Sequence, residues 1–99
     1  MYNIIIGDLL FSWDEEKSKK NLIKHGISFE EATEVFGDYH AKLYDDPFHS
    51  DDEERFIILG LLKRGTICVV CHCYRENESV IRIISARKAT KNEEKEYWR

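Results

Sequence analysis

The chain has 99 residues, of which 42% are hydrophobic and 34% charged, and these totals predict one globular domain over residues 1–99. The formal net charge is −4, which argues mildly against nucleic-acid binding, but residues 1–54 carry 5 basic and 14 acidic side chains whereas residues 55–99 carry 10 and 5. No segment has the length and apolarity of a membrane span, and the N-terminus lacks the basic start of a secretion signal, so we expect a cytoplasmic protein.

An apolar strand and a helix are expected first. Residues 2–11 are rich in Ile and Leu, which favours a short strand bent at Gly7. Ser12, followed three residues later by Glu15, has the pattern of a capping box, so we expect a helix that begins here and continues to about Lys24. Lysines repeat at helical spacing along this segment and predict a cationic helix face.

A second helix and another strand follow. Ser28 and Glu31 repeat the capping pattern, and an apolar stripe then continues as far as Phe36. Residues 39–44 favour a strand. Residues 45–54 combine six acids with the single proline of the chain and predict a solvated loop.

The second half of the chain predicts three strands joined by short turns. They are expected over residues 55–62, 66–74 and 80–85. The middle strand is almost wholly apolar, as is typical of a central strand. A short C-terminal helix is expected over residues 93–98, capped by Thr90 or Asn92. The predicted fold class is α+β: an antiparallel meander with two N-terminal helices packed on it and a short helix at the end.

A basic stretch near the end of the chain is the most informative feature for function. Between Arg82 and Asn92 there are four basic side chains and no acid. Cations gathered in this way suit a polyanion, and RNA is the first to consider. Arg82 lies in an apolar strand, where alternation places it on the face opposite Ile81 and Ile83. Arg82 and Arg87 could each bind phosphate bidentately or form an ion pair within the fold.

Several other side chains offer chemistry, each with a structural alternative. Histidine is best suited to move a proton near neutral pH, and the chain has four: His25, His40, His49 and His72. His25 ends the first predicted helix, where the helix dipole favours a cation without any catalytic role. Arg55 follows a run of acids and is either a phosphate ligand or their ion-pair partner. Tyr97 could stack on a base, although terminal aromatic residues more often pack a helix onto a sheet.

The three cysteines fall within one predicted strand. They are Cys68, Cys71 and Cys73, and their odd number without a secretion signal favours reduced thiols. Alternation places Cys71 and Cys73 on one face and Cys68 on the other. Because no ligand spacing accompanies them, we expect small buried apolar side chains rather than metal ligands, and we expect no metal or cofactor.

The chain resembles the BrnT family in three places. The opening of the family matches FSWDEEK at residues 11–17 and NLIKHGISFEEA at residues 21–32. Its middle motif is similar to HSDDEERF at residues 49–56, and its end is similar to IRIISARKAT at residues 81–90. The resemblance continues to residue 97, and the spacing of these motifs is distinctive. About ten residues precede the first motif, more than the family pattern has.

The resemblance implies a toxin of a bacterial type II toxin–antitoxin system, with a RelE-like fold, that cleaves RNA and inhibits translation. It also implies a BrnA-like antitoxin that carries a ribbon-helix-helix DNA-binding part, so that DNA is contacted only through this partner. A hetero-oligomer with an antitoxin dimer is then expected. The resemblance draws attention to matched residues without assigning a role to each. Together with the basic stretch, it makes five residues candidates for catalysis (His25, His49, Arg55, Arg82 and Arg87) and four for RNA contact (Lys24, Lys88, Lys91 and Tyr97).

Two hypotheses follow from the basic stretch and the resemblance together. In the first, the chain is a metal-independent endoribonuclease in which cations stabilise charge on the phosphate and His25 or His49 moves the proton. In the second, the chain is a non-catalytic module whose basic half pairs with a DNA-binding partner. A metalloenzyme is disfavoured because no metal-ligand spacing is present.

Overall fold

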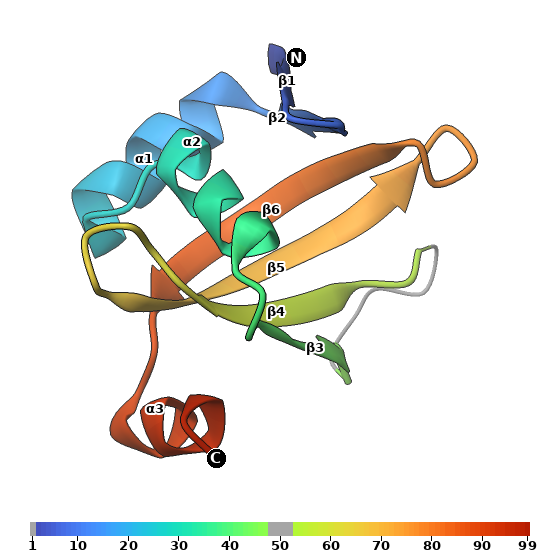
Figure 1. Ribbon diagram of the computed structural model, residues 1–99. Helices are drawn as coiled ribbons and strands as arrows, with labels where there is room; N and C mark the ends of the chain where they lie inside the picture. The colour runs from blue at the N-terminus through green and yellow to red at the C-terminus, as the bar shows by residue number, and fades with distance from the viewer. Residues whose placement is uncertain (1, 48–52) are drawn as a thin grey trace.

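The computed structural model describes residues 2–47 and 53–99, so His49 lies outside the described residues. A six-stranded sheet runs through the molecule (Figure 1). Its strands are β1 (Tyr2–Ile6), β2 (Leu9–Trp13), β3 (Lys42–Asp45), β4 (Phe56–Leu61), β5 (Ile67–Arg75) and β6 (Val80–Lys88). The helices are α1 (Glu15–His25), α2 (Phe29–Ala32), the 3-10 helix η1 (Thr33–Gly37) and α3 (Lys91–Tyr97). None of the described helices is long and apolar enough to span a membrane.

The sheet is mixed, whereas an antiparallel meander was expected. Strands β3 to β6 do form that meander, but the spatial order is β1-β2-β6-β5-β4-β3, and β2 pairs with β6 in parallel. The expectation was wrong because the first segment is a hairpin and not one bent strand. Gly7 has a φ of 61°, which turns the chain back on itself, and this brings residues 10–12 beside residues 80–82. The two main helices consequently follow a hairpin rather than a single strand.

The first helix begins two residues later than the capping pattern indicated. Asp14 is the N-cap, and its side chain accepts hydrogen bonds from the backbone of Glu16 and Lys17. Ser12 lies in β2, where it is buried opposite Arg82. The prediction of Ser12 as the N-cap was wrong because the pairing of β2 with β6 extends the strand through the Ser12 position. Gly26 ends the helix with a φ of 73°, as expected.

The second helix is capped as expected but is shorter. The Ser28 hydroxyl accepts a 3.0 Å hydrogen bond from the backbone of Glu31. The α-helix continues only to Ala32, after which the chain tightens into η1, and this 3-10 turn carries Val35 against β4. An ideal Cβ on Gly60 would lie 2.7 Å from the Val35 Cβ, so only glycine allows this approach.

The last strand is longer than predicted, and this moves part of the basic stretch. Strand β6 continues to Lys88 because Arg87 and Lys88 pair with Val69 and Cys68 of β5. Both residues therefore lie on a strand and not in the connection to the last helix. Thr90 is the cap of α3, in a capping box with Glu93. Strand β3 also begins later than expected, at Lys42.

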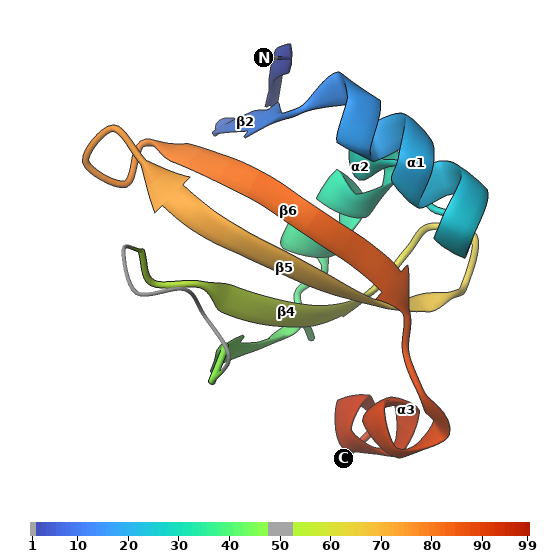
Figure 2. The ribbon, with the colours of Figure 1, turned by 180° about the vertical axis from the view of Figure 1, so that it is seen from behind.

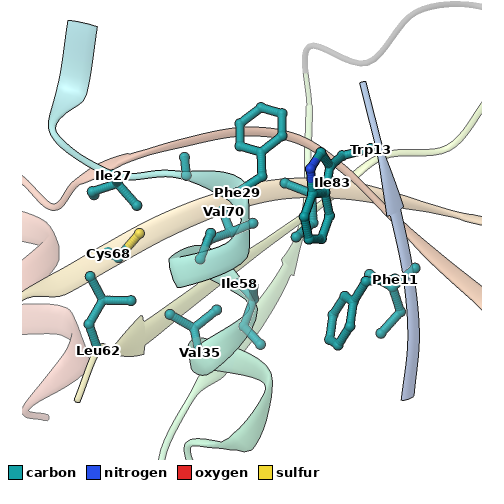
Figure 3. Close-up of a cluster of buried hydrophobic side chains, with 13 residues drawn as sticks. Phe11, Trp13, Ile27, Phe29, Val35, Ile58, Leu62, Cys68, Val70 and Ile83 are labelled. Carbon is teal, nitrogen blue, oxygen red and sulfur yellow. The ribbon is translucent and has the colours of Figure 1, made fainter. Parts of the chain in front are cut away.

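Helices α2 and η1 cover one face of the sheet and enclose the main core, and α1 lies beside them along β6 (Figures 1 and 3). The core includes Phe11 and Trp13 of the hairpin, Phe29 of α2, and Cys68 and Val70 of β5. Such burial stabilises by about 25 cal/mol per Å² of apolar surface. Alternation sends Cys71 and Cys73 to the opposite face, as predicted.

We call this opposite side the α3 face, because α3 packs on one end of it (Figure 2). Tyr97 of α3 packs there against Leu59, Ile67 and Val69.

Candidate functional site

A buried asparagine places α1 along the edge of β6 beyond the end of β2. The Asn21 side chain donates to the carbonyl of Ala86 at 2.7 Å and accepts from the amide of the same residue at 3.3 Å, as a neighbouring strand would. It also donates to the carbonyl of Ile27. Lys17 lies one helical turn before Asn21, so it is directed to the part of β6 that precedes Ala86.

A pocket of about 140 Å³ lies where Lys17 meets the α3 face of the sheet. It is lined by Lys17, Glu53, Arg55, Arg75 and Arg82, with Ile83 and Ile84. Within the described part of the chain, the lining thus combines four cationic side chains with one carboxylate. We call this the cationic pocket. Alternation predicted the place of Arg82 correctly, since Arg82 pairs with Cys73 on the face opposite Ile81 and Ile83.

The single carboxylate is shared between two of the arginines. An oxygen of Glu53 lies 3.0 Å from Nη2 of Arg75, and the other oxygen lies 3.6 Å from Nη2 of Arg55. The Arg55 Nε is buried and has no hydrogen-bond partner among the described residues. A buried donor without a partner is costly, so this end of the pocket favours an additional acceptor such as a phosphate oxygen.

Arg87 does not line the cationic pocket but forms an ion pair with α3. Its guanidinium donates two hydrogen bonds to Glu93, at 2.8 and 2.9 Å, and holds the start of α3 against β6. These bonds are the main reason that the pKa of the Glu93 carboxyl falls to about 2, and they raise the pKa of Arg87. Of the two alternatives from the sequence, the ion pair therefore holds for Arg87. It lies roughly 15 Å along β6 from Arg82.

The remaining predicted residues lie outside the cationic pocket. Lys24 is exposed and His25 half-buried at the end of α1, about 12 Å along the helix from Lys17. Lys88 and Lys91 are exposed near the start of α3. Tyr97 is buried and its hydroxyl donates to Asp38, so it packs α3 onto the sheet, which was the structural alternative.

The buried titratable groups favour packing roles. His72 is fully buried among Phe36, Phe56 and Tyr74, and burial lowers its pKa to about 4. Burial also raises the pKa of Cys68 to about 12 and that of Cys71 to about 11, so both thiols stay protonated near neutral pH. The described residues contain no group of three or more His, Cys, Asp or Glu that could hold a metal ion.

Three residues of the cationic pocket were not singled out from the sequence: Lys17, Glu53 and Arg75. Lys17 was visible only as part of a lysine-rich helix face, and nothing local distinguished it from Lys20. Arg75 and Arg82 lie seven residues apart, but the β5–β6 hairpin places them on one face. An alternation count carried through both strands would have found this pair.

The comparisons with known proteins agree with this architecture. A family model described as the ribonuclease toxin BrnT of type II toxin–antitoxin systems matches residues 13–93. The chain belongs to the BrnT family. Its structure is similar to the crystal structure of the Brucella abortus ribonuclease toxin BrnT, with a TM-score of 0.61 and 24% identity, over 82% of this chain and 96% of that one. No curated protein matches the sequence.

The cationic pocket lies within the part of the chain that matches the BrnT family. All five charged residues of the pocket lie within the matched segment, residues 13–93. The hairpin precedes that segment except for its last residue, Trp13. Since the family consists of toxins of type II toxin–antitoxin systems, membership also implies an antitoxin partner for this chain.

Proposed function

We propose that this BrnT chain is a metal-independent endoribonuclease that binds RNA on its α3 face and cleaves it at the cationic pocket. The observation that carries the proposal is the convergence of Lys17, Arg55, Arg75 and Arg82 on one small pocket. Preorganised cations stabilise the charge that develops on a phosphate during cleavage, and they do so most strongly where water is partly excluded.

In the proposed reaction, the ribose 2′-hydroxyl attacks the adjacent phosphorus, and the bond from phosphorus to the 5′-oxygen breaks. The products are a 2′,3′-cyclic phosphate and a 5′-hydroxyl. Arg82 and Arg55 bind the non-bridging oxygens, since a guanidinium offers two parallel donors. Lys17 approaches from α1 and gives its proton to the departing 5′-oxygen.

The proton of the 2′-hydroxyl needs an acceptor close to the phosphate. Glu53 fits this role because it is the one carboxylate in the described lining, and its ion pairs hold it beside the cations. His49 stays a candidate that lies outside the described residues. His25 is the weaker candidate, because it is at the far end of α1 from Lys17.

In the cell, cleavage of RNA would inhibit translation in the cytoplasm until an antitoxin neutralises the toxin. We propose that this antitoxin is BrnA-like, with a ribbon-helix-helix part, and that it supplies the only contact of the complex with DNA. Two copies of the toxin on an antitoxin dimer would make the hetero-oligomer.

The second candidate, a non-catalytic binding module, is favoured by the Glu53 ion pairs. In that reading, Glu53 pairs with Arg55 and Arg75, Glu93 pairs with Arg87, and these ion pairs serve stability alone. Cleavage of RNA by the purified chain separates the two candidates.

The test is cleavage of a labelled single-stranded RNA by the purified chain in the presence of chelator. We expect cleavage by the parent chain, a loss of about 100-fold or more for Arg82→Ala, and little change for Arg87→Ala, the matched arginine on the same strand. Intact RNA with the parent chain, or equal rates for all three proteins, would contradict the enzyme and support the binding module. Growth arrest on expression of the chain alone, relieved by Arg82→Ala, is the corresponding result in cells.

A further inference from the structure

The N-terminal hairpin forms one wall of a second, larger pocket, on the face of the sheet opposite the cationic pocket. This pocket has a volume of about 570 Å³. Ile6, Leu9 and Phe11 of the hairpin face Phe36 of η1 across it. We call it the hairpin groove. Ile6 is 41% exposed and Leu9 is 39% exposed, so the groove presents apolar surface to solvent.

Acidic side chains border the apolar surface of the hairpin groove. Asp8 belongs to the hairpin turn, Glu30 to α2 and Glu34 to η1. Lys63 is the only basic residue in the described lining, and its backbone amide donates to the Glu34 carboxylate. The groove therefore combines an apolar floor with a net negative rim, the opposite of the cationic pocket.

The outer strand of the hairpin is open to a further strand. Strand β1 pairs only with β2 within the described sheet, and its sequence Tyr-Asn-Ile-Ile-Ile contains no charge. Ile5 is 72% exposed on this strand. Edge strands of soluble proteins normally carry charges or proline that block pairing, and an edge without them favours a partner.

We propose that the hairpin groove and the β1 edge together form the docking surface for the antitoxin, through a segment that presents apolar side chains flanked by Lys or Arg. The inference rests on the proposed function, since it assigns a surface to the antitoxin partner. Charge complementarity identifies the occupant: basic residues of the segment would face Asp8, Glu30 and Glu34. A second copy of the chain docked symmetrically through the same groove would bring two acidic rims together, and RNA would be repelled by them.

The position of the hairpin agrees with a partner-specific role. It lies almost wholly before residues 13–93, the segment that matches the family. The hairpin groove opens on the face of the sheet that α2 and η1 cover, whereas Arg75 and Arg82 of the cationic pocket lie on the α3 face. A segment seated in the hairpin groove would thus anchor the antitoxin without contacting the cations, and the rest of the antitoxin would have to reach around the sheet to block them.

The experiment uses the purified chain and, as the probe, the purified protein encoded by the reading frame adjacent to its gene. Binding is measured by titration calorimetry at two salt concentrations. We expect Glu30→Lys to weaken binding at least tenfold and to reduce its salt dependence, because Glu30 is an exposed rim charge. The matched control is Glu94→Lys, which reverses an equally exposed acid in the first turn of α3 and should change binding less than twofold.

A second variant tests the apolar floor. Leu9→Asp should weaken binding at least tenfold while circular dichroism shows that the fold is kept. Equal affinity of the parent chain and Glu30→Lys would overturn the docking site, as would a failure of the adjacent protein to bind, or a stable dimer of the chain alone through the hairpin.

The cleavage assay keeps this proposal separate from the proposed function. The Glu30→Lys chain should cleave RNA as fast as the parent chain, since its substitution is remote from the cationic pocket. Cleavage with no effect of Glu30→Lys on binding overturns the docking surface alone. Binding that depends on Glu30 without any cleavage of RNA overturns the ribonuclease alone.

Discussion

The hydroxyl of Tyr97 donates a 2.6 Å hydrogen bond to Oδ2 of Asp38, across 59 positions of the sequence. The same carboxylate oxygen accepts a 2.8 Å bond from the backbone of Leu61. One carboxylate thus ties α3 to the end of β4 and to the turn after η1. Burial, with a further contribution from the bond to Asp38, raises the pKa of Tyr97 to about 12.

Removal of this hydroxyl should affect stability and leave RNA cleavage unchanged. We expect Tyr97→Phe to lower the free energy of unfolding by about 1 kcal/mol, the usual value of such a bond. Urea denaturation measures the change, with Tyr39→Phe as control because that ring is 94% exposed. A fall in the cleavage rate without a loss of stability would instead restore Tyr97 as an RNA contact.

Substitution of Glu53 should strengthen RNA binding but slow RNA cleavage. Glu53→Gln removes the negative charge that competes with phosphate for Arg55 and Arg75, so a non-cleavable 2′-deoxy oligonucleotide should bind a few times more tightly. Cleavage should slow by about 100-fold or more, because the proton acceptor is lost. Fluorescence anisotropy and a gel assay measure the two quantities. Glu54→Gln, an exposed neighbour, serves as control, and parallel changes in binding and cleavage would exclude the proton-transfer role.

The buried His72 should make the protein less stable in mild acid. Its pKa is lowered from 6.5 to about 4 by burial, so between these values the unfolded chain takes up a proton that the folded chain does not. The contribution of neutral His72 to the free energy of unfolding is fully present above pH 6.5. It is lost as pH falls towards 4, and the loss amounts to about 3 kcal/mol.

Substitution of His72 by phenylalanine should remove this part of the pH dependence. Thermal unfolding at several pH values between 7.5 and 4 compares His72→Phe with the parent chain, and the gap between their unfolding free energies should change in favour of the variant as pH falls. A gap that is constant over this range would mean that His72 does not control the acid sensitivity.

The contact between η1 and β4 should be intolerant of one added methyl group. Gly60→Ala forces its Cβ to within 2.7 Å of the Val35 Cβ, with the Val35 Cα also close, so the backbone of η1 must move. We expect a loss of about 1–3 kcal/mol in chemical denaturation. Gly37→Ala is the control, since a Cβ there meets nothing within 4 Å and should leave stability nearly unchanged.

Elements with strong local signals were predictable from the sequence. Ser28, Gly26 and Thr90 mark helix ends through their own backbone and side-chain chemistry, and the structure places all three as caps. Short turns join the strands β4, β5 and β6, so the sequence predicted both these strands and their antiparallel order. The face of Arg82 followed as well, because alternation needs no knowledge of the partner strand.

Features that depend on distant pairing were not predictable in this way. The parallel pairing of β2 with β6 joins residues about seventy positions apart, and no local sequence pattern predicts it. That contact also explains why Ser12 is a strand residue. The cationic pocket has the same origin, since its side chains come from α1, from the segment before β4, and from β5 and β6.

The pairing of β2 near the start of the chain with β6 near its end has a consequence for synthesis on the ribosome. A nascent chain that has not yet reached Val80 lacks the strand against which β2 pairs and beside which α1 lies. The same incomplete chain lacks Arg82 and Ala86, so neither the cationic pocket nor the Asn21 contact can form. A chain built in this order acquires its charge cluster only when the last strand has emerged, so on the proposed function it would be inactive during its own translation.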